Sequence, residues 1–346
     1  MTAPGRLLAS GVQGDVYLSR RTTLVAVKVV HAPKDGDDPQ LRPHNAAREA
    51  RLLASLRHPN IVTLLEYTYD GAHHLTLEVL PLPLPIVMTN RAAFMSVARG
   101  LFSGLSFLHS RGVAHRDIKP DNVLLSVEGI PKLIDFSTAC TEGNNSVCQV
   151  GTGPYRAPEL LFGPHKYDAR ALDLWAAGAT LAEFYLPRPG GSALNDRQSA
   201  ISEGGSSGDS SSSISSPGIA DDCGTLFNAA FGDLGLAGSI FSVLGTPTSE
   251  TWPSFTTLPD AGKIRFDPKA AKDIESVLSA PEGTGRILEA VLRLDPAQRV
   301  SAQAVLLMMD EDGDGVLDEI KERAMSEWEK MERFLETGEQ WLGRYN

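Results

Sequence analysis

The sequence predicts a bilobal α+β fold, in which a small, mostly β lobe precedes a larger, mostly helical lobe. In the first 80 residues, the β-branched run Val25–Val30 is typical of a buried strand, and Ile61–Leu65 and Leu75–Leu80 are expected to form two more. One helix is expected at Ala46–Leu56, where apolar residues recur at helical spacing until a His-Pro-Asn sequence ends the pattern. Helical patterns dominate the remainder of the chain.

A proline-rich connector separates the two expected lobes. Pro81–Pro85 alternates proline with leucine, which suits neither a helix nor a central strand, so we place a hinge near Glu78–Pro85. The small lobe is thus expected to span residues 1–80 and the larger lobe residues 81–309. Helices of the larger lobe are expected at Ala92–Ser110, Ala171–Tyr185 and Gly285–Leu294.

Two segments depart from this plan. Residues 187–222 are rich in serine and glycine and have little to bury, which predicts a disordered insertion. Residues 310–346 form an acidic helical tail, which we expect to pack on the larger lobe. A partner-binding helix is the alternative, and an exposed Trp328 would favour it. The apolar residues at helical spacing in this tail are Met325, Trp328, Met331, Leu335 and Leu342.

Composition indicates a globular protein of the cytoplasm or nucleus. Hydrophobic residues make up 42% and charged residues 22%, as in soluble globular domains. The sequence contains no apolar run of about eighteen residues and no readable signal peptide. Cys140, Cys148 and Cys223 share no CxxC spacing, which suits a reducing compartment. A net charge of −11 argues against a nucleic-acid or anionic-membrane surface.

Residues suited to phosphoryl transfer follow one another along the chain. This chemistry needs the triphosphate held, its charge neutralised and the acceptor hydroxyl aimed in line. In the segment from Leu8 to Val16, Gly11 and Gly14 would let the backbone approach phosphate oxygens. Alone, that segment fits an ordinary glycine hairpin better, and Lys28 and Glu49 alone would be solvated surface groups.

The decisive pattern is His115–Asn122 (HRDIKPDN), followed by Asp135-Phe136-Ser137 and Ala157-Pro158-Glu159. This set resembles the catalytic motifs of eukaryotic Ser/Thr protein kinases. The resemblance implies transfer of the γ-phosphate of Mg²⁺-bound ATP to a protein hydroxyl. It covers roughly Leu8 to Met308, interrupted by the insertion.

The resemblance also implies a role for each matching residue. Asp117 is similar to the catalytic carboxylate, and Lys119 marks Ser/Thr rather than Tyr kinases. Asn122 and Asp135 match the Mg²⁺ ligands. Lys28 matches the lysine that contacts the α- and β-phosphates, and Glu49 its ion-pair partner. The nucleotide-binding residues are expected to be Leu8, Gly11, Gly14, Val16, Ala26, Lys28 and Leu124.

Two positions depart from the kinase pattern. Ala9 replaces the first loop glycine, and Ser137 replaces the glycine that follows Asp135-Phe136. A pseudokinase scaffold that binds partners without catalysis is therefore the alternative of a different class. Since every residue that handles charge is intact, we favour an active enzyme. Binding of nucleotide with Mg²⁺ would discriminate between the two.

Within the kinases, three segments resemble the cyclin-dependent kinase branch. Pro43–Glu49 lies where such kinases carry the cyclin-contacting PSTAIRE helix, Gly151–Glu159 is similar to their TxWYRAPE segment, and Leu244–Pro253 to their LGTPxxxxWP stretch. Asp173 and Arg299 match structural anchors of the larger lobe.

The regulatory positions of that branch are altered. Val12 and Gln13 replace the inhibitory Thr-Tyr pair, and Val147 occupies the position of the activating threonine. Arg116 would then lack its phosphate partner, for which Glu142 could substitute in part. A kinase with neither switch resembles the single-chain CDK-activating kinases of fungi, so the expected substrate is a cyclin-dependent kinase.

The rival interpretation is a kinase that itself works with a cyclin. Ala47 replaces the larger isoleucine that a cyclin groove would bury, which weakens this interpretation without removing it. We therefore expect a cyclin to be a possible partner that is not required.

An acidic stretch in the tail, Asp310–Asp318, matches the first nine positions of an EF-hand calcium loop. Lys321 occupies the twelfth position, where a bidentate glutamate is needed. A solvated acidic turn is thus the favoured interpretation, and calorimetry should detect no calcium binding below millimolar concentrations.

Overall fold

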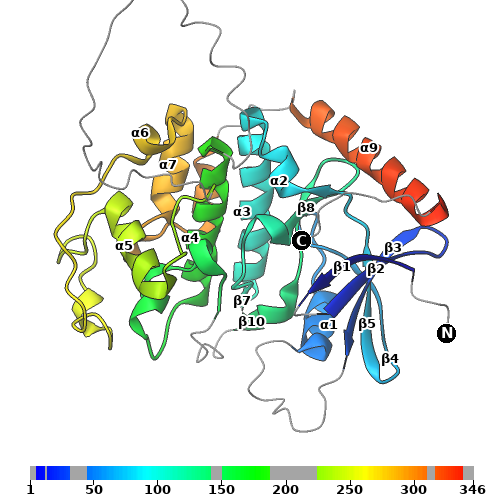
Figure 1. The fold of residues 1–346 in the computed structure, drawn as a ribbon, viewed down its shortest axis with the longest axis horizontal. Helices are drawn as coiled ribbons and strands as arrows, with labels where there is room; N and C mark the ends of the chain where they lie inside the picture. The colour runs from blue at the N-terminus through cyan, green and yellow to red at the C-terminus, as the bar shows by residue number, and fades with distance from the viewer. Residues whose placement is uncertain are drawn as a thin grey trace, which may run out of the picture.

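In the computed structural model, the small lobe is a five-stranded antiparallel sheet with one helix packed against it (Figure 1). The structure describes residues 5–11, 14–31, 45–141, 150–187, 224–309 and 316–337. The strands lie in the order β1-β2-β3-β5-β4. These elements are β1 (Arg6–Gly11), β2 (Gly14–Arg20), β3 (Leu24–His31), α1 (Ala46–Ser55), β4 (Leu64–Tyr69) and β5 (Ala72–Glu78).

The centre of this sheet is β3, the β-branched run expected to be a buried strand. It pairs with β2 on one side and β5 on the other. Helix α1 begins at a defined cap, where the Asn45 side chain accepts a hydrogen bond of 2.9 Å from the backbone N–H of Arg48. Leu53 of α1 is fully buried, which fixes the helix against the core. The lysine of β3 and the glutamate of α1 are thereby brought to one side of the sheet.

The expected strand at Ile61–Leu65 was wrong in its bounds. Strand β4 begins at Leu64, and Ile61 instead forms an isolated bridge with Leu133 of the larger lobe. Most of β4 is exposed, Tyr67 and Tyr69 included, because β4 is an edge strand. Its sequence therefore lacks the alternation of apolar and polar residues that would mark a half-buried strand.

The connector is more structured than its proline content suggested. It holds the short strand β6 (Leu82–Pro83), which pairs with β8, and the short helix α2 (Leu84–Val87). Pro85 lies in the first turn of α2, where a missing N–H group breaks no intrahelical hydrogen bond. The hinge is therefore anchored to the larger lobe directly after it leaves the small one.

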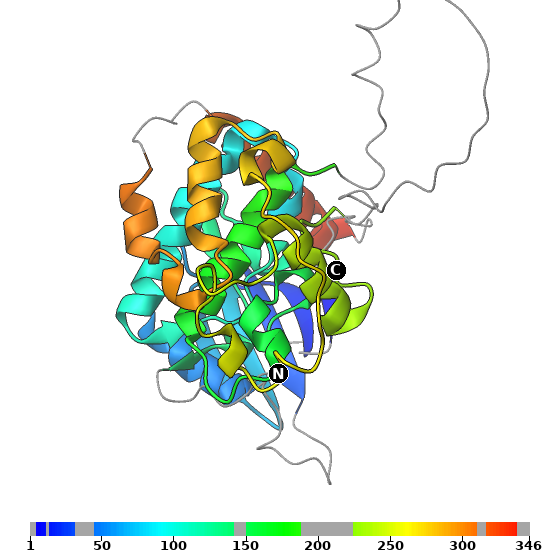
Figure 2. The same cartoon turned by 90° about the vertical axis from the view of Figure 1, so that its left-hand side faces the viewer.

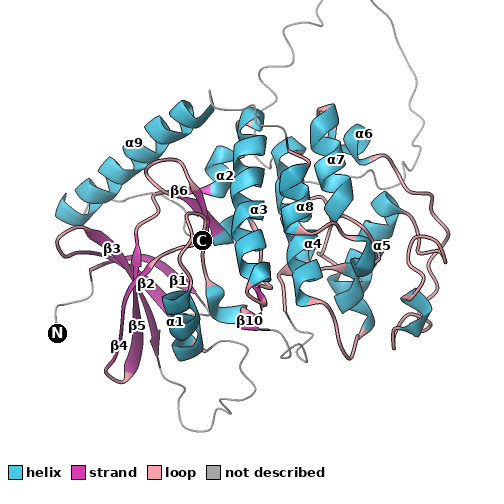
Figure 3. Cartoon of the chain, turned by 180° about the vertical axis from the view of Figure 1, so that it is seen from behind, coloured by secondary structure: helices cyan, strands magenta, loops and turns pink. Residues whose placement is uncertain are grey.

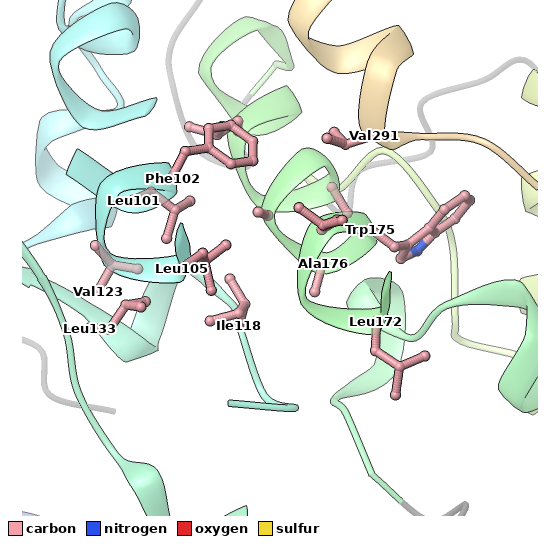
Figure 4. Packing of buried hydrophobic residues seen from close by; sticks show 14 of the residues in the cluster. Leu101, Phe102, Leu105, Ile118, Val123, Leu133, Leu172, Trp175, Ala176 and Val291 are labelled. Atoms are coloured by element: carbon pink, nitrogen blue, oxygen red, sulfur yellow. The ribbon is translucent and has the colours of Figure 1, made fainter. Parts of the chain in front are cut away.

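The larger lobe is mostly helical, which confirms the predicted bilobal α+β fold (Figures 2 and 3). Its core includes the layer between α3 and α4: Figure 4 shows Phe102 and Leu105 of α3 on the side of that helix that faces α4, whereas Trp175 lies on the far side of α4. Its helices are α3 (Phe94–Ser110), α4 (Ala169–Ala182), α5 (Gly232–Leu244), α6 (Ile274–Leu278), α7 (Glu282–Val291) and α8 (Ala302–Leu307). Its short strands are β7 (Val113–Ala114), β8 (Val123–Leu125), β9 (Pro131–Leu133) and β10 (Cys140–Thr141).

The tail forms one helix, α9 (Val316–Thr337), which packs on the larger lobe as expected in its first half but on the small lobe in its second half. Figures 1 and 3 show α9 running from the larger lobe, beside α2, to the strands of the small lobe. Trp328 is half-buried there, whereas Met325 faces solvent with 47% of its surface exposed. The helical spacing of the apolar residues in this tail did not show that Met325 lies outside the buried face of α9.

Several predictions concern residues outside the described ranges. These are the serine-rich insertion after Pro187, the acidic turn at residues 310–315 and Leu342. Of the helices that the structure does describe, none has the length and apolar character needed to cross a membrane.

Candidate active site

A cleft between the two lobes contains every residue expected to bind nucleotide. The cavity has a volume of about 360 Å³ and is mostly apolar. Leu8, Val16 and Ala26 lie on its small-lobe side, and Leu124 of β8 lies on the opposite side. Further lining residues, which the sequence did not mark as nucleotide-binding, include Val62, Leu77, Val79, Leu80, Pro83 and Ile134.

The turn between β1 and β2 requires glycine at one position. Gly14 has a φ of +124°, and a Cβ atom there would lie 2.3 Å from the carbonyl oxygen of Val29. At Gly11, in contrast, a Cβ atom would meet nothing within 4 Å. Both glycines line the cavity, so the backbone of the hairpin borders the space in which phosphates would lie.

Lys28 is held by carboxylates from two separate elements. Its Nζ donates to Glu49 Oε1 and Oε2 at 3.0 and 2.9 Å and to Asp135 Oδ1 at 2.8 Å. Burial acts to lower the pKa of Lys28, but the charges and hydrogen bonds of Glu49 and Asp135 outweigh it and raise the pKa. Lys28 is therefore a fixed positive charge at the inner end of the cleft.

Asp135 and Asn122 supply oxygen atoms on the same cleft. Burial acts to raise the pKa of Asp135, but the Lys28 charge outweighs it and lowers the pKa to about 2. The Nδ2 group of Asn122 donates to the carbonyl and to Oδ2 of Asp117 at 2.7 and 3.0 Å. This orientation leaves the amide oxygen of Asn122 as its metal-binding atom. A carboxylate and an amide oxygen fit Mg²⁺, which needs few protein ligands because it retains water.

Asp117 lies at the centre of a small hydrogen-bond network. Its Oδ1 accepts the hydroxyl of Thr152 at 2.6 Å, and Lys119 Nζ lies 3.0 Å from both Asp117 Oδ2 and Thr152 Oγ1. Thr152 belongs to the Gly151–Glu159 segment, whose motif assigns no role to this threonine. The hydrogen bond from Thr152 shows that a neutral hydroxyl fits against the Asp117 carboxylate.

The loop that carries Asp117 is fixed from beneath by Asp173 of α4. The fully buried Asp173 carboxylate accepts the backbone N–H groups of His115 and Arg116 at 2.9 and 2.7 Å. Arg116 has a φ of +66°, a conformation that a non-glycine residue adopts only when its surroundings impose it. Asp173 thus stabilises the strained loop, in line with its structural interpretation.

Two arginines hold the start of the segment that follows Asp135. Arg116 donates to the carbonyl oxygen of Thr138 at 2.8 Å and to the hydroxyl of Tyr167 at 3.1 Å. Arg48 donates to the carbonyl oxygen of Ser137 at 3.1 Å. Burial and the charge of Arg116 lower the pKa of Arg48. Tyr167 has no sequence motif that could have identified it. Val12, Gln13, Glu142 and Val147 lie outside the described residues.

A bilobal fold with a lysine–glutamate pair and a carboxylate loop around one cleft defines a protein kinase. The family model of the protein kinase domain matches residues 3–308, and the chain belongs to this family. Members use ATP and transfer its phosphate to protein hydroxyls, and Lys119 in the loop of Asp117 is of the Ser/Thr rather than the Tyr type, so the chain is a Ser/Thr protein kinase.

Within the family, the chain is similar to cyclin-dependent kinases. It is 31% identical over 314 residues to cyclin-dependent kinase D-1 of Oryza sativa subsp. indica, covering 87% of this chain and 64% of that protein. It is 30% identical to cyclin-dependent kinase D-1 of Arabidopsis thaliana, covering 68% of it. Cyclin-dependent kinase 7 of Carassius auratus is 31% identical, with 80% covered.

A solved structure shows the same fold. A chain of the CAK complex of Chaetomium thermophilum, bound to ATP-γ-S, matches with a TM-score of 0.69 and 26% identity. The match covers 88% of each chain. The chain is therefore a kinase of the cyclin-dependent type, and the resemblance found in the sequence is confirmed.

Proposed function

We propose that this kinase phosphorylates the activation loop of cyclin-dependent kinases and that it does so without requiring a cyclin. The similarity to cyclin-dependent kinases D-1 and 7 and to the CAK complex supports this substrate. The chain spans only 64% of the length of the rice kinase, so the substrate of that whole protein is a proposal for this chain.

One observation carries the proposal: Arg116 engages oxygens of its own chain. Its guanidinium donates to Thr138 and Tyr167, and Arg48 donates to Ser137. At the same time, the Lys28–Glu49 pair is closed. Neutral oxygens thus hold the segment after Asp135 in an arrangement that keeps the catalytic groups together.

The residues of the cleft would act in the following way. Asn122 and Asp135 would hold Mg²⁺, which when bound would neutralise charge on the phosphates. Lys28 would hold the phosphates by its charge, and the backbone at Gly11 and Gly14 borders the space in which they would lie. Asp117 would orient the acceptor hydroxyl and take its proton. The hydrogen bond from the Thr152 hydroxyl to Asp117 supports this role, because it shows that the carboxylate can accept from a hydroxyl.

The test is phosphate transfer by the purified chain onto a catalytically inactive cyclin-dependent kinase whose activation loop is intact. We expect transfer to the loop threonine without added cyclin, and a loss of about 10²- to 10⁴-fold in Asp117→Asn. A substrate whose loop threonine is replaced by alanine serves as the matched control. Transfer to generic peptides but not to this loop would overturn the proposed substrate and leave the kinase activity intact.

The second candidate is a kinase that itself depends on a cyclin. The similar structure from Chaetomium thermophilum was solved as a complex, which favours this candidate. If the isolated chain phosphorylates no substrate and gains activity when a cyclin is added, it is a cyclin-dependent kinase.

A further inference from the structure

Helix α9 lies beyond the part of the chain that matches the kinase family, which ends at residue 308. Its 22 residues give it a length of about 33 Å, enough to extend across both lobes. Ile320, Ala324 and Met331 are almost completely buried, and they lie on one face of the helix. The helix is therefore a packed element of the enzyme.

The first half of α9 rests on the larger lobe. Ile320 and Ala324 belong to its hydrophobic core. Gly129 lies close beneath the helix, because a Cβ atom there would come within 3.0 Å of Ile320. Glu319 accepts a hydrogen bond of 2.8 Å from Asn90.

The second half of α9 rests on the small lobe. Met331 has no exposed surface and packs in a separate cluster with Leu18, Leu24 and Val79. At the edge of this cluster, the Arg6 guanidinium lies 5.4 Å from the ring centre of Phe334. Arg20 lies 3.7 and 3.4 Å from the carboxylates of Glu332 and Glu336. These exposed ion pairs add little free energy, so the apolar contacts dominate the docking.

The cluster around Met331 also forms one wall of the nucleotide cleft. Leu8 and Ala26 pack against it, Val79 belongs to it, and all three residues line the cavity. One layer of side chains thus separates Met331 from the space expected to hold the nucleotide base. We propose that α9 positions this wall, so that Met331 is a positioning residue that sets the affinity of the kinase for ATP without touching it.

The two halves of α9 provide a matched test. Met331→Ala removes the contact behind the cleft, and Ile320→Ala removes a comparable buried side chain that packs on the larger lobe. Met325→Ala, on the solvent side of the same helix, controls for the substitution itself. The measurements are KM for ATP, kcat, KM for a generic Ser/Thr peptide and Kd for Mg²⁺-ADP, so the physiological substrate does not enter.

We expect Met331→Ala to raise KM for ATP and Kd for ADP by about 10-fold, since a displaced wall loses contact with the base. At saturating ATP, kcat should change less than about 2-fold, and KM for the peptide should stay constant. Ile320→Ala should lower stability without a selective increase in KM for ATP. Met325→Ala should change neither stability nor KM for ATP.

An unchanged KM for ATP in Met331→Ala would overturn the proposal. Equal increases in Met331→Ala and Ile320→Ala would also overturn it, because they would indicate a general loss of stability. If Met331→Ala fails to fold, Leu335→Ala removes a half-buried neighbour from the same cluster. Leu335→Ala should then raise KM for ATP by a smaller factor and leave the other constants unchanged. An unchanged KM for ATP in this variant would count against the proposal.

Discussion

Two buried ion pairs lie in different parts of the molecule, and they are built differently. Arg299 forms a two-pronged pair with Glu159, with both N–O distances at 2.7 Å. Its remaining donors reach the carbonyl oxygens of Ala171, Arg293 and Leu294. Lys28, in contrast, is shared between the carboxylates of Glu49 and Asp135.

The difference lies in which elements each pair joins. Every partner of Arg299 belongs to the larger lobe, and its side chain has no exposed surface. The partners of Lys28 come from α1 of the small lobe and from the segment after β9, and Asp135 keeps 21% of its side chain exposed toward the cleft. The first arrangement fixes one lobe internally, whereas the second brings separate parts together where phosphates would bind.

Replacing Lys28 should have the largest effect on activity and a smaller effect on stability than replacing Arg299. We expect kcat/KM of Lys28→Met to fall by about 10³-fold, because a fixed positive charge is lost where charge develops. Burial already raises the pKa of Glu49, so this carboxyl can take up a proton once Lys28 is gone. Kinase assays and urea unfolding measure the two effects. Lys263→Met, at an exposed pair, is the control and should change neither.

Replacing Arg299 should reverse that pattern. Arg299→Met leaves Glu159 buried without its partner, and we expect a loss of about 3–5 kcal/mol in the free energy of unfolding. The folded fraction should retain a kcat close to that of the wild type, since the pair lies within the larger lobe. Urea unfolding and assays at low temperature separate these quantities. A normal unfolding midpoint would show that this pair does not anchor the lobe.

The sequence predicted the residues of the cleft better than their supports. Asp117, Asn122 and Asp135 occur in motifs whose order and residue types reflect the chemistry, and the fold brings them to one cleft. Their roles stay predictions until the variants are measured. Thr152 and Tyr167 gave no comparable signal, because a hydroxyl that supports a neighbour can come from many positions in the chain.

The position of α9 could not be predicted from the sequence, for a related reason. Helical spacing indicates which residues share a face, but it does not say which surface covers that face. The cluster around Met331 joins β2, β3 and the hinge, which are hundreds of residues away in the chain. Such a contact depends on the assembled lobes and leaves no local pattern.

A milder change among Lys28, Glu49 and Asp135 should show that Glu49 of α1 positions the lysine. Glu49→Gln keeps the shape of the side chain but removes its charge, and we expect a loss of about 10- to 100-fold in kcat. Nucleotide affinity should fall less, because Asp135 still pairs with Lys28. Steady-state kinetics with Mg²⁺-ATP measures both. An unaltered kcat would mean that Lys28 needs only one carboxylate.

The smallest expected effect is a dependence of stability on pH that belongs to the Lys28 group. The pKa of Asp135 lies at about 2 in the folded protein, below its ordinary value of 3.8, since the Lys28 charge outweighs burial. Its carboxylate therefore contributes fully to stability above about pH 4, and the contribution is lost as the pH falls toward 2. The displacement corresponds to about 2 kcal/mol.

Asp135→Asn should be less stable than the wild type at pH 5, and the difference should shrink as the pH is lowered toward 3. Urea unfolding at several pH values measures this convergence. Asp318→Asn is the matched control, because its side chain is 81% exposed, and it should follow the wild type throughout. A constant difference between Asp135→Asn and the wild type would contradict the argument. In that case the structural link between Lys28 and Asp135 would not be an electrostatic one, and the contrast with the Arg299 pair would rest on geometry alone.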